Sequence, residues 1–498
     1  MVSNSDVLAD ILSAIKQYSH HNAFVIEDKT YTYEDLGKKV ANIYNCISAL
    51  ENNAIGIVAE NDIETYASIL AVLFSDKTYV ILHPSYPCDR NLKIATLAGL
   101  KTVLCSDNTE CDYLSRNGIN ILSSRIENNA VVDSILYTAN GSSNAYVIFT
   151  SGSTGEPKGV PISRDNLNAF YKAYHQIGWK LDANDRMLQM FELTFDVSVV
   201  STLYPLAIGA CIYPVGYKDV KYLKVFDLLE QYELTFAAVA PSVLQLISPY
   251  FDEIRLPSLK YLVVTAEASQ VELLSRFKNS IPNAEIYNLY GPTEATIYCT
   301  YYHTPVEGNC KQHNGMVAIG KPFMNTQVLI VNEDGAEVPR GTLGEMWVSG
   351  PQVMKGYFND SQKSAEALVK DNNGNMFYKT GDLCIMDADE DIIYCGRKDY
   401  QVKIQGFRIE LSEIEFNAKQ YFDPIPNIVV IPVLSAGICS ELHMVIEVET
   451  CDTTALHKYL SQKLPHYMLP KKIHCIGQFP TTASNKIDRK QISQLINN

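Results

Sequence analysis

Short apolar runs alternate along the chain with stretches whose apolar residues recur at helical spacing. Residues 63–74 have the helical period, and apolar runs of strand length lie beside them at residues 55–58, 79–82 and 102–104. The same alternation returns further on, where the runs at residues 236–239, 261–264 and 285–287 are each followed by a segment of helical character. This pattern predicts a large α/β body with more than one sheet.

The pattern changes at about residue 327. Strand-like runs separated by turn residues follow there, at 328–331 and 345–348, which predicts a β-rich subdomain. From about Arg397 the last hundred residues have a strand–helix pattern of their own. We therefore predict a multi-subdomain body over residues 1–396, with two α/β sheets and the β-rich part, followed by a small α+β domain over residues 397–498.

Composition narrows the class of function. The chain has 498 residues, of which 47% are hydrophobic and 19% charged, with a net charge of −15 and a pI near 5.2. An acidic surface argues against binding to nucleic acid or to an anionic membrane, so an anionic ligand must be met by a local site. No apolar run approaches the roughly 18 residues of a membrane span, and the N-terminus is polar. We expect a soluble protein of the cytoplasm.

The twelve cysteines are scattered, without a Cys-x-x-Cys pair, and the histidines are not clustered. This distribution is typical of reduced thiols and indicates no zinc site.

Residues 150–160, with the sequence Thr-Ser-Gly-Ser-Thr-Gly-Glu-Pro-Lys-Gly-Val, carry the strongest chemical signal. They contain three glycines, four hydroxyl side chains and Lys158 directly after a predicted strand at 145–149. Glycines let backbone N–H groups approach an anion, so this composition is typical of a phosphate cradle. A Walker A loop is excluded because Gly159, rather than Ser or Thr, follows Lys158. Taken alone, the segment also fits a surface turn.

Five further blocks follow at long range. Residues 195–198 place Asp196 among apolar residues, where a lone carboxylate needs a cationic partner. Residues 288–296 combine an aromatic ring able to stack on a base with a Gly-Pro turn, a hydroxyl and a carboxylate suited to Mg²⁺. Asp382, in residues 378–383, is an acceptor for a diol. The remaining blocks are the charged run at 396–410 and a polar loop at 484–489.

The six blocks, in this order, resemble the superfamily of adenylate-forming enzymes, and the resemblance covers nearly the whole chain. This superfamily includes adenylation domains of nonribosomal peptide synthetases, D-alanine–carrier protein ligases, acyl-CoA synthetases and luciferases. The resemblance implies ATP and Mg²⁺ as cofactors and a mobile small domain. It assigns ATP and AMP binding to Thr150, Ser151, Gly152, Thr154, Asn288, Tyr290, Gly291, Asp382 and Arg397.

The resemblance also implies the catalytic residues. Lys486 would bridge the substrate carboxylate and the α-phosphate, and Lys403 would face the active site during the second half-reaction. Glu294 would hold Mg²⁺, and Asp399 would be the hinge of the small domain. The other residues implied at the phosphates are Lys158 and Thr293. Such a site neutralises charge while one anion attacks another.

Three positions depart from the family pattern. Gln405 stands where arginine is usual, and Ser412 stands where glycine is usual. Asn485 replaces a glycine before Lys486, at a turn that asparagine tolerates. A neutral Gln405 weakens the expected contact with a thiol carrier.

Asp196 is the main indication of substrate class. In amino-acid-activating members, an aspartate at this place meets the substrate α-ammonium; the alternative is a helix cap or a satisfied core carboxylate. The family pocket has no charge here, which favours a small neutral amino acid. Residues 195–205 most resemble the D-alanine–carrier protein ligases, so D-alanine is the leading candidate. Each lining residue fits ordinary core equally well; they are Val197, Val200, Ala238, Val263, Thr265, Leu289, Ile297 and Tyr298.

The sequence contains no Gly-Gly-x-Ser segment of the kind that bears a phosphopantetheine. We therefore expect the thiol to come from a separate carrier protein. Two alternatives stay open, an acyl-CoA or aryl-CoA synthetase that uses free coenzyme A and a non-catalytic nucleotide-binding protein. Asp196 would be incidental in the first, and the presence of Lys158, Glu294 and Lys486 argues against the second.

Overall fold

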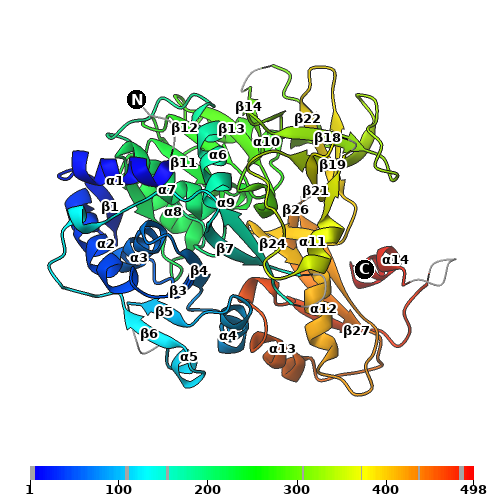
Figure 1. Ribbon diagram of the computed structural model, residues 1–498. Coiled ribbons are helices and arrows are strands. Elements are labelled where there is room, and N and C mark those ends of the chain that lie inside the picture. Colours follow the sequence, from blue (N-terminus) through cyan, green and yellow to red (C-terminus); the bar gives the residue numbers. More distant parts are fainter. Residues whose placement is uncertain are drawn as a thin grey trace. The chain divides into compact units, whose positions relative to one another are not determined.

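The structure, a computed structural model, describes residues 6–106, 111–152, 156–305, 308–371, 373–435, 438–481 and 487–497 (Figure 1). It divides into two units. The first comprises the described residues of Met1–Pro84, Ala95–Ile148 and Gly159–Lys398, and the second those of Ser85–Ile94, Phe149–Lys158 and Asp399–Asn498. The confirmed fold class is mixed α/β, and the mobility of the small domain stays a prediction.

A six-stranded sheet is built from the N-terminal third of the chain. Helix α3 (Ile63–Phe74) packs on β3 and β4, and α2 (Tyr33–Ile47) packs on α3. The Asp62 side chain caps α3 by accepting from the Thr65 N–H at 2.9 Å. In spatial order the strands are β6 (Asn120–Ser123), β5 (Thr102–Cys105), β3 (Ala54–Val58), β4 (Thr78–Leu82), β7 (Asn144–Thr150) and β8 (Lys158–Ser163).

A nine-stranded sheet follows, in which six neighbouring strands are parallel. Parallel strands are covered on both faces, which explains their continuous apolar sequences. In spatial order the strands are β17 (Lys321–Pro322), β14 (Thr300–Thr304), β13 (Glu285–Tyr290), β12 (Tyr261–Val264), β11 (Phe236–Val239), β9 (Arg186–Gln189), β10 (Cys211–Pro214), β1 (Asn22–Ile26) and β2 (Lys29–Thr32). The predicted strands at 236–239 and 261–264 are confirmed.

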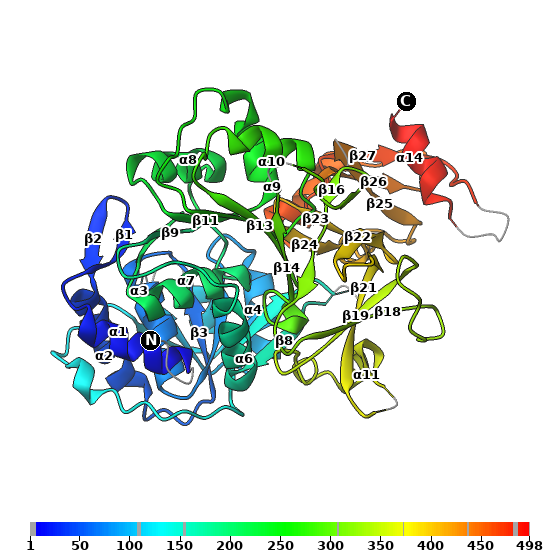
Figure 2. The same ribbon diagram turned by 90° about the horizontal axis from the view of Figure 1, so that it is seen from above.

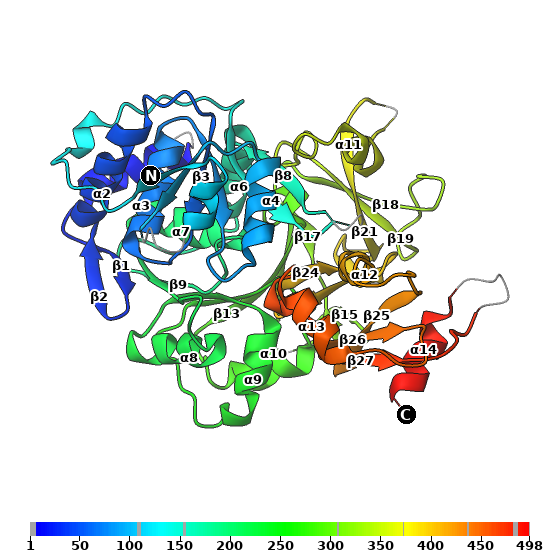
Figure 3. The same cartoon turned by 90° about the horizontal axis from the view of Figure 1, so that it is seen from below.

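Helices cover both faces of this sheet (Figures 2 and 3). Helix α7 (Val197–Ile208) packs on β9 and β10 from one side. Helices α8 (Lys221–Gln231), α9 (Pro241–Ile247) and α10 (Val271–Lys278) lie on the other. The other helices of the N-terminal half are α1 (Val7–Gln17), α4 (Cys88–Leu97), α5 (Asp112–Arg116) and α6 (Arg164–His175).

The β-rich part predicted from residue 327 is an antiparallel sheet with one helix, and a short hairpin precedes it in the sequence. Its strands are β18 (Gln327–Val331), β19 (Leu343–Ser349), β20 (Leu368–Lys370), β21 (Met376–Met386) and β22 (Ile392–Arg397). The hairpin is β15 (Gln312–His313) with β16 (Met316–Val317), and the helix is α11 (Ser361–Ala367).

The C-terminal segment of the second unit has the predicted α+β character. It starts with a hairpin of β23 (Gln401–Ile404) and β24 (Phe407–Glu410), followed by α12 (Leu411–Lys419). A three-stranded sheet of β25 (Ile428–Ser435), β26 (Ile438–Ile446) and β27 (Lys472–Cys475) is accompanied by α13 (Thr453–Ser461) and α14 (Arg489–Asn497). One apolar cluster consists of Val429, Ile431, Val445, Phe479 and Ile492.

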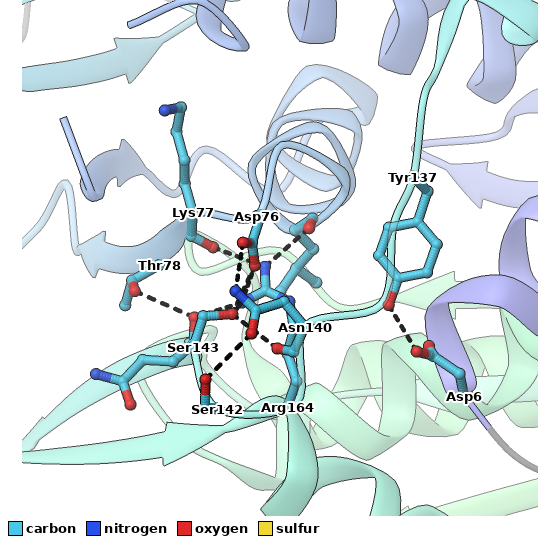
Figure 4. A network of polar contacts seen from close by, with 11 residues as sticks. Asp6, Asp76, Lys77, Thr78, Tyr137, Asn140, Ser142, Ser143 and Arg164 are labelled. Carbon is cyan, nitrogen blue, oxygen red and sulfur yellow. Dashed lines mark hydrogen bonds and ion pairs between the residues drawn. The ribbon is translucent and has the colours of Figure 1, made fainter. Parts of the chain in front are cut away.

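Arg164 holds three segments of the first unit together (Figure 4). Its side chain is 2% exposed, and it donates to the carbonyls of Leu73, Lys77 and Asn144 at 2.7 to 3.0 Å. It also lies 3.4 Å from the Asp76 carboxylate. These hydrogen bonds from the two Nη groups offset the cost of burying a guanidinium, although its buried Nε has no hydrogen-bond partner among the described residues. Arg164 thereby ties the start of α6 to the end of α3 and the start of β7.

Two expectations about the whole chain can be compared with this fold. Cys105 and Cys111 form a disulfide, so the prediction of reduced thiols is wrong for this pair; no other disulfide exists among the described residues. The fold brings the end of β5 next to the residue that precedes α5, and no sequence motif marks that proximity. No helix among the described residues is long and apolar enough to cross a bilayer.

Candidate active site

The glycine loop leaves the sheet at the end of β7. A Cβ on Gly152 would lie 2.0 Å from the Glu156 carbonyl oxygen, so only glycine permits this close approach of the two residues. The Ser151 hydroxyl donates to the Arg408 carbonyl at 3.0 Å, and the Gly152 N–H donates to Glu413 at 3.2 Å. The Thr150 hydroxyl is buried and has no hydrogen-bond partner among the described residues. Thr154 lies outside the described residues.

The predicted adenine-binding block begins on the last residues of β13. The Asn288 amide donates to the Ala318 carbonyl at 2.9 Å. The Tyr290 hydroxyl donates to Asp382, and burial together with the Asp382 charge raises the pKa of this phenol. A Cβ on Gly291 would lie 2.5 Å from the Ile297 carbonyl oxygen, which explains the glycine after Tyr290.

Asp382 and Arg397, predicted to hold the ribose, are paired directly. They are register partners on β21 and β22, and Arg397 Nη1 lies 2.7 Å from Asp382 Oδ1. The Arg397 side chain is 12% exposed and the Asp382 side chain 7%, so the pair is well shielded from water. Asp399, the predicted hinge, begins the long segment of the second unit, and its carboxylate accepts from the Gln401 N–H at 3.1 Å.

Thr293 and Glu294 lie in a single 3-10 turn, Thr293–Ala295. The Glu294 side chain is fully buried and accepts from the Tyr357 hydroxyl at 2.8 Å. No group of three or more His, Cys, Asp or Glu side chains suited to a metal exists among the described residues. Mg²⁺ in nucleotide sites needs only one or two carboxylates besides the phosphates, so Glu294 fits that need.

The backbone after Glu294 is strained. Thr296 and Ile297 have φ values of 55° and 71°, in the left-handed region that β-branched residues avoid. Gln352 maintains this conformation, because its amide donates to the carbonyls of Ala295 and Tyr298 at 2.6 Å. The backbone carbonyl of Gln352 accepts from the Thr296 hydroxyl at 2.5 Å. Sequence reasoning missed Gln352, which carries no motif.

Asp196 occupies the N-cap position of α7. Its side chain makes no capping hydrogen bond, so the helix-capping alternative is wrong, and the residue is 7% exposed. Burial raises the pKa of the phenols of Tyr79, Tyr146 and Tyr298, and the Asp196 charge raises all three further. The buried Asp196 carboxylate therefore disfavours ionisation of these three phenols.

The predicted pocket residues are all buried. Val197 and Val200 are on α7, whereas the others follow or end parallel strands of the nine-stranded sheet. Ala238 is on β11, Val263 on β12 and Leu289 on β13, with Thr265, Ile297 and Tyr298 in the segments after β12 and β13. Ligands of open α/β sheets bind at the carboxyl ends of the strands, which is where Thr265, Ile297 and Tyr298 lie. Most of the set also belongs to the main core.

Comparison with known proteins gives the family. The model of the AMP-binding enzyme family matches residues 12–358, well over half of the chain. The chain belongs to the AMP-binding enzyme family. It is accordingly an adenylate-forming ligase, a class that uses ATP.

Relatives of this adenylate-forming enzyme differ in length. The D-alanine–D-alanyl carrier protein ligase of Bacillus licheniformis is 31% identical over 505 residues, which cover 97% of this chain and 99% of that ligase. Zwittermicin A synthase ZmaJ of Bacillus cereus is 31% identical over 494 residues, covering 95% and 92%. Tyrocidine synthase 1 of Brevibacillus parabrevis is also 31% identical, but the chain spans only 43% of it.

Among solved structures, the adenylation domain AlmE of Vibrio cholerae, in complex with glycyl-adenosine-5'-phosphate, has a TM-score of 0.88 to this enzyme. It is 25% identical, and the match covers 100% of this chain and 98% of AlmE. The fold of the adenylate-forming enzyme is therefore that of an adenylation domain.

Three lysines were predicted to serve this ligase. Lys158 is half-buried at the start of β8, and Lys403 is half-buried on β23, opposite Arg408. Lys486 lies outside the described residues. The turn after Lys403 has φ values of 51° at Gln405 and 84° at Gly406, which is typical of a type I′ hairpin.

One partly buried charge cluster of the ligase has no counterpart in the sequence prediction. Glu192 Oε2 lies 2.6 Å from His83 Nε2, and Glu192 Oε1 lies 3.4 Å from Lys221 Nζ. Burial raises the pKa of Glu192, but the His83 hydrogen bond and the Lys221 charge outweigh it and bring the pKa to about 2. No signal in the sequence links these three distant residues.

Proposed function

We propose that this enzyme activates a small neutral amino acid, with D-alanine favoured, as an aminoacyl-AMP and transfers it to the phosphopantetheine thiol of a separate carrier protein. The buried carboxylate of Asp196 carries this proposal, because it is suited to an ammonium group and not to an amine-free acid. The full-length similarity to the D-alanine–D-alanyl carrier protein ligase supports it, as does AlmE, which was solved with a glycyl adenylate.

In the first half-reaction, an oxygen of the amino-acid carboxylate forms a bond to the α-phosphorus of ATP, and pyrophosphate leaves. Thr150, Ser151, Gly152, Thr154, Lys158 and Thr293 would bind the phosphates. Lys486 would neutralise the two approaching anions, and Mg²⁺ held by Glu294 would supply further positive charge. Tyr290, with Asn288, would hold the adenine, and the Asp382–Arg397 pair the ribose.

In the second half-reaction, the carrier thiolate attacks the acyl carbonyl, a thioester bond forms, and AMP leaves with the electrons of the broken anhydride bond. Lys403 would face the site in this step, after the small domain turns about Asp399. Two half-reactions with different leaving groups need different surroundings, which is the reason to expect such a turn.

ATP–pyrophosphate exchange tests this proposal directly. A panel should contain glycine, both alanine enantiomers, serine, leucine, phenylalanine, lysine and glutamate, together with amine-free alkyl and aryl acids. We expect the small neutral amino acids to give the highest rate and D-alanine to lead. Fastest exchange with an amine-free acid would contradict the proposal and favour the acyl-CoA or aryl-CoA synthetase. Carrier loading against coenzyme A loading then distinguishes the two thiols.

A further inference from the structure

Two of the predicted phosphate-binding groups already have partners inside the second unit. The Gly152 N–H donates to Glu413 Oε2 at 3.2 Å. The Ser151 hydroxyl accepts from the Glu410 N–H at 3.1 Å while it donates to the Arg408 carbonyl. All these residues lie in the second unit, in the segments Phe149–Lys158 and Asp399–Asn498. Ser151 and Gly152 are thus bound by the end of β24 and the start of α12.

Glu413 is held in place by an arginine from a third segment of the same unit. Arg90 Nη1 lies 2.7 Å from Glu413 Oε1, and the side chains are 7% and 1% exposed. Burial opposes the charge of Arg90, but the Glu413 carboxylate outweighs it and raises the pKa of the guanidinium. A carboxylate buried to this extent needs such pairing, and its second oxygen is directed at the loop.

The chemistry of this contact resembles that of a bound phosphate. A backbone N–H of a glycine-rich loop is the donor that a phosphate oxygen uses, and here an anionic carboxylate oxygen accepts from it. One N–H cannot serve both acceptors well, and two anions at the same donor repel each other.

We propose that Glu413 is a positioning residue that competes with the ATP phosphates for the Gly152 N–H. The Gly152 N–H then alternates between two anions, with the triphosphate bound before adenylation and Glu413 bound once pyrophosphate has left. Arg90 keeps the Glu413 carboxylate available for that exchange. This role rests on the proposed function, because it assumes that the loop binds ATP phosphates.

Calorimetric titration of the full chain with MgATP, with no amino acid present, tests the competition directly. Glu413→Gln removes the negative charge, and we expect its dissociation constant for MgATP to fall by about tenfold. In pyrophosphate exchange, the KM for ATP should fall similarly while kcat stays unchanged. Loading of the carrier from preformed aminoacyl-AMP should become slower. A merely structural defect would lower the active fraction, and hence kcat, with no change in the KM for ATP.

Glu415→Gln is the matched control. Glu415 lies on the same helix, is buried, and pairs with Arg489 at 2.7 Å, but it accepts from the Val430 N–H rather than from the loop. Its ATP affinity should equal that of the wild type. Glu413→Asp, which keeps the charge but draws it back by one methylene, is a second variant in case the glutamine variant does not fold, and it should also bind MgATP more tightly.

Equal MgATP affinity in the wild type and the folded Glu413 variants would overturn the competition. Failure of the proposed function looks different, since the wild type would then bind MgATP, with tighter binding by Glu413→Gln, but exchange no pyrophosphate with any amino acid. A wild type that binds no MgATP would overturn both.

Discussion

Replacement of Asp196 by asparagine removes the carboxylate charge at constant size and tests the proposed ammonium contact. Asp196 is 7% exposed, so water screens this charge weakly. Two unit charges about 4 Å apart interact by about 4 kcal/mol when the effective dielectric constant is about 20. Loss of one partner of a buried pair costs about 3–5 kcal/mol, since the other charge stays desolvated. The expected loss in kcat/KM for the amino acid is therefore roughly a hundredfold to a few thousandfold.

The assay is pyrophosphate exchange at saturating ATP, with the amino-acid concentration varied, and MgATP titration confirms that the variant still binds nucleotide. Asp185→Asn is a matched control. Asp185 is also buried and pairs with Lys260 at 2.7 Å, but it precedes β9, whereas Asp196 follows that strand. The control should lose stability and keep the KM for the amino acid. Activation of the amino acid by Asp196→Asn at a rate near that of the wild type would refute the ion pair. A variant that still prefers amino acids to amine-free acids as strongly as the wild type would also refute it.

The remaining predictions address separate parts of the enzyme. Lys486→Ala should abolish pyrophosphate exchange, whereas Lys403→Ala should keep exchange and slow carrier loading; equal loss of exchange in both would exclude this division. Thr265→Gly should move the substrate preference in the exchange panel toward longer side chains, because each methylene forced into a packed pocket costs about 1–3 kcal/mol; an unchanged preference would remove Thr265 from the pocket. Arg164→Met leaves three carbonyls without their donor and should cost about 3 kcal/mol or more, seen as a lower melting temperature in calorimetry, with Arg164→Lys in between. The pKa of Glu192 is depressed, so the ionised side chain stabilises the fold above the unfolded pKa of 4.5, and this contribution is lost as the pH falls toward about 2. The difference in free energy of unfolding between wild type and Glu192→Gln should shrink over that pH window, and a constant difference would contradict the shift.

Local patterns predicted much of this fold. The apolar runs at 236–239 and 261–264 coincide with β11 and β12. A parallel strand is buried on both faces, so its consecutive residues are all apolar and the sequence shows it directly. The glycines of the two nucleotide blocks were also readable, since Gly152 and Gly291 each face backbone atoms that leave no room for a side chain. The order of the motifs sufficed for the family.

Contacts between distant segments could not be read in this way. Gln352 acts on residues more than fifty positions earlier, and the Arg90–Glu413 pair spans 323 positions. Such residues have no periodicity or spacing to mark them, because their role comes only from the folded arrangement. The cap role considered for Asp196 failed for a similar reason, since its position before α7 is that of a cap but its side chain makes no capping hydrogen bond.

The left-handed backbone at Thr296 and Ile297 bears on how this enzyme would evolve. Each such residue costs about 1–3 kcal/mol, and glycine would remove that cost at either position. The same substitution at Ile297 would take away a branched side chain from the predicted pocket. Because Ile297 is 1% exposed, that loss of packing costs about 2–5 kcal/mol, which outweighs the strain relieved. Selection for heat resistance and selection for selectivity would therefore both keep isoleucine at this position, and a laboratory lineage bred only for thermostability is expected to retain it.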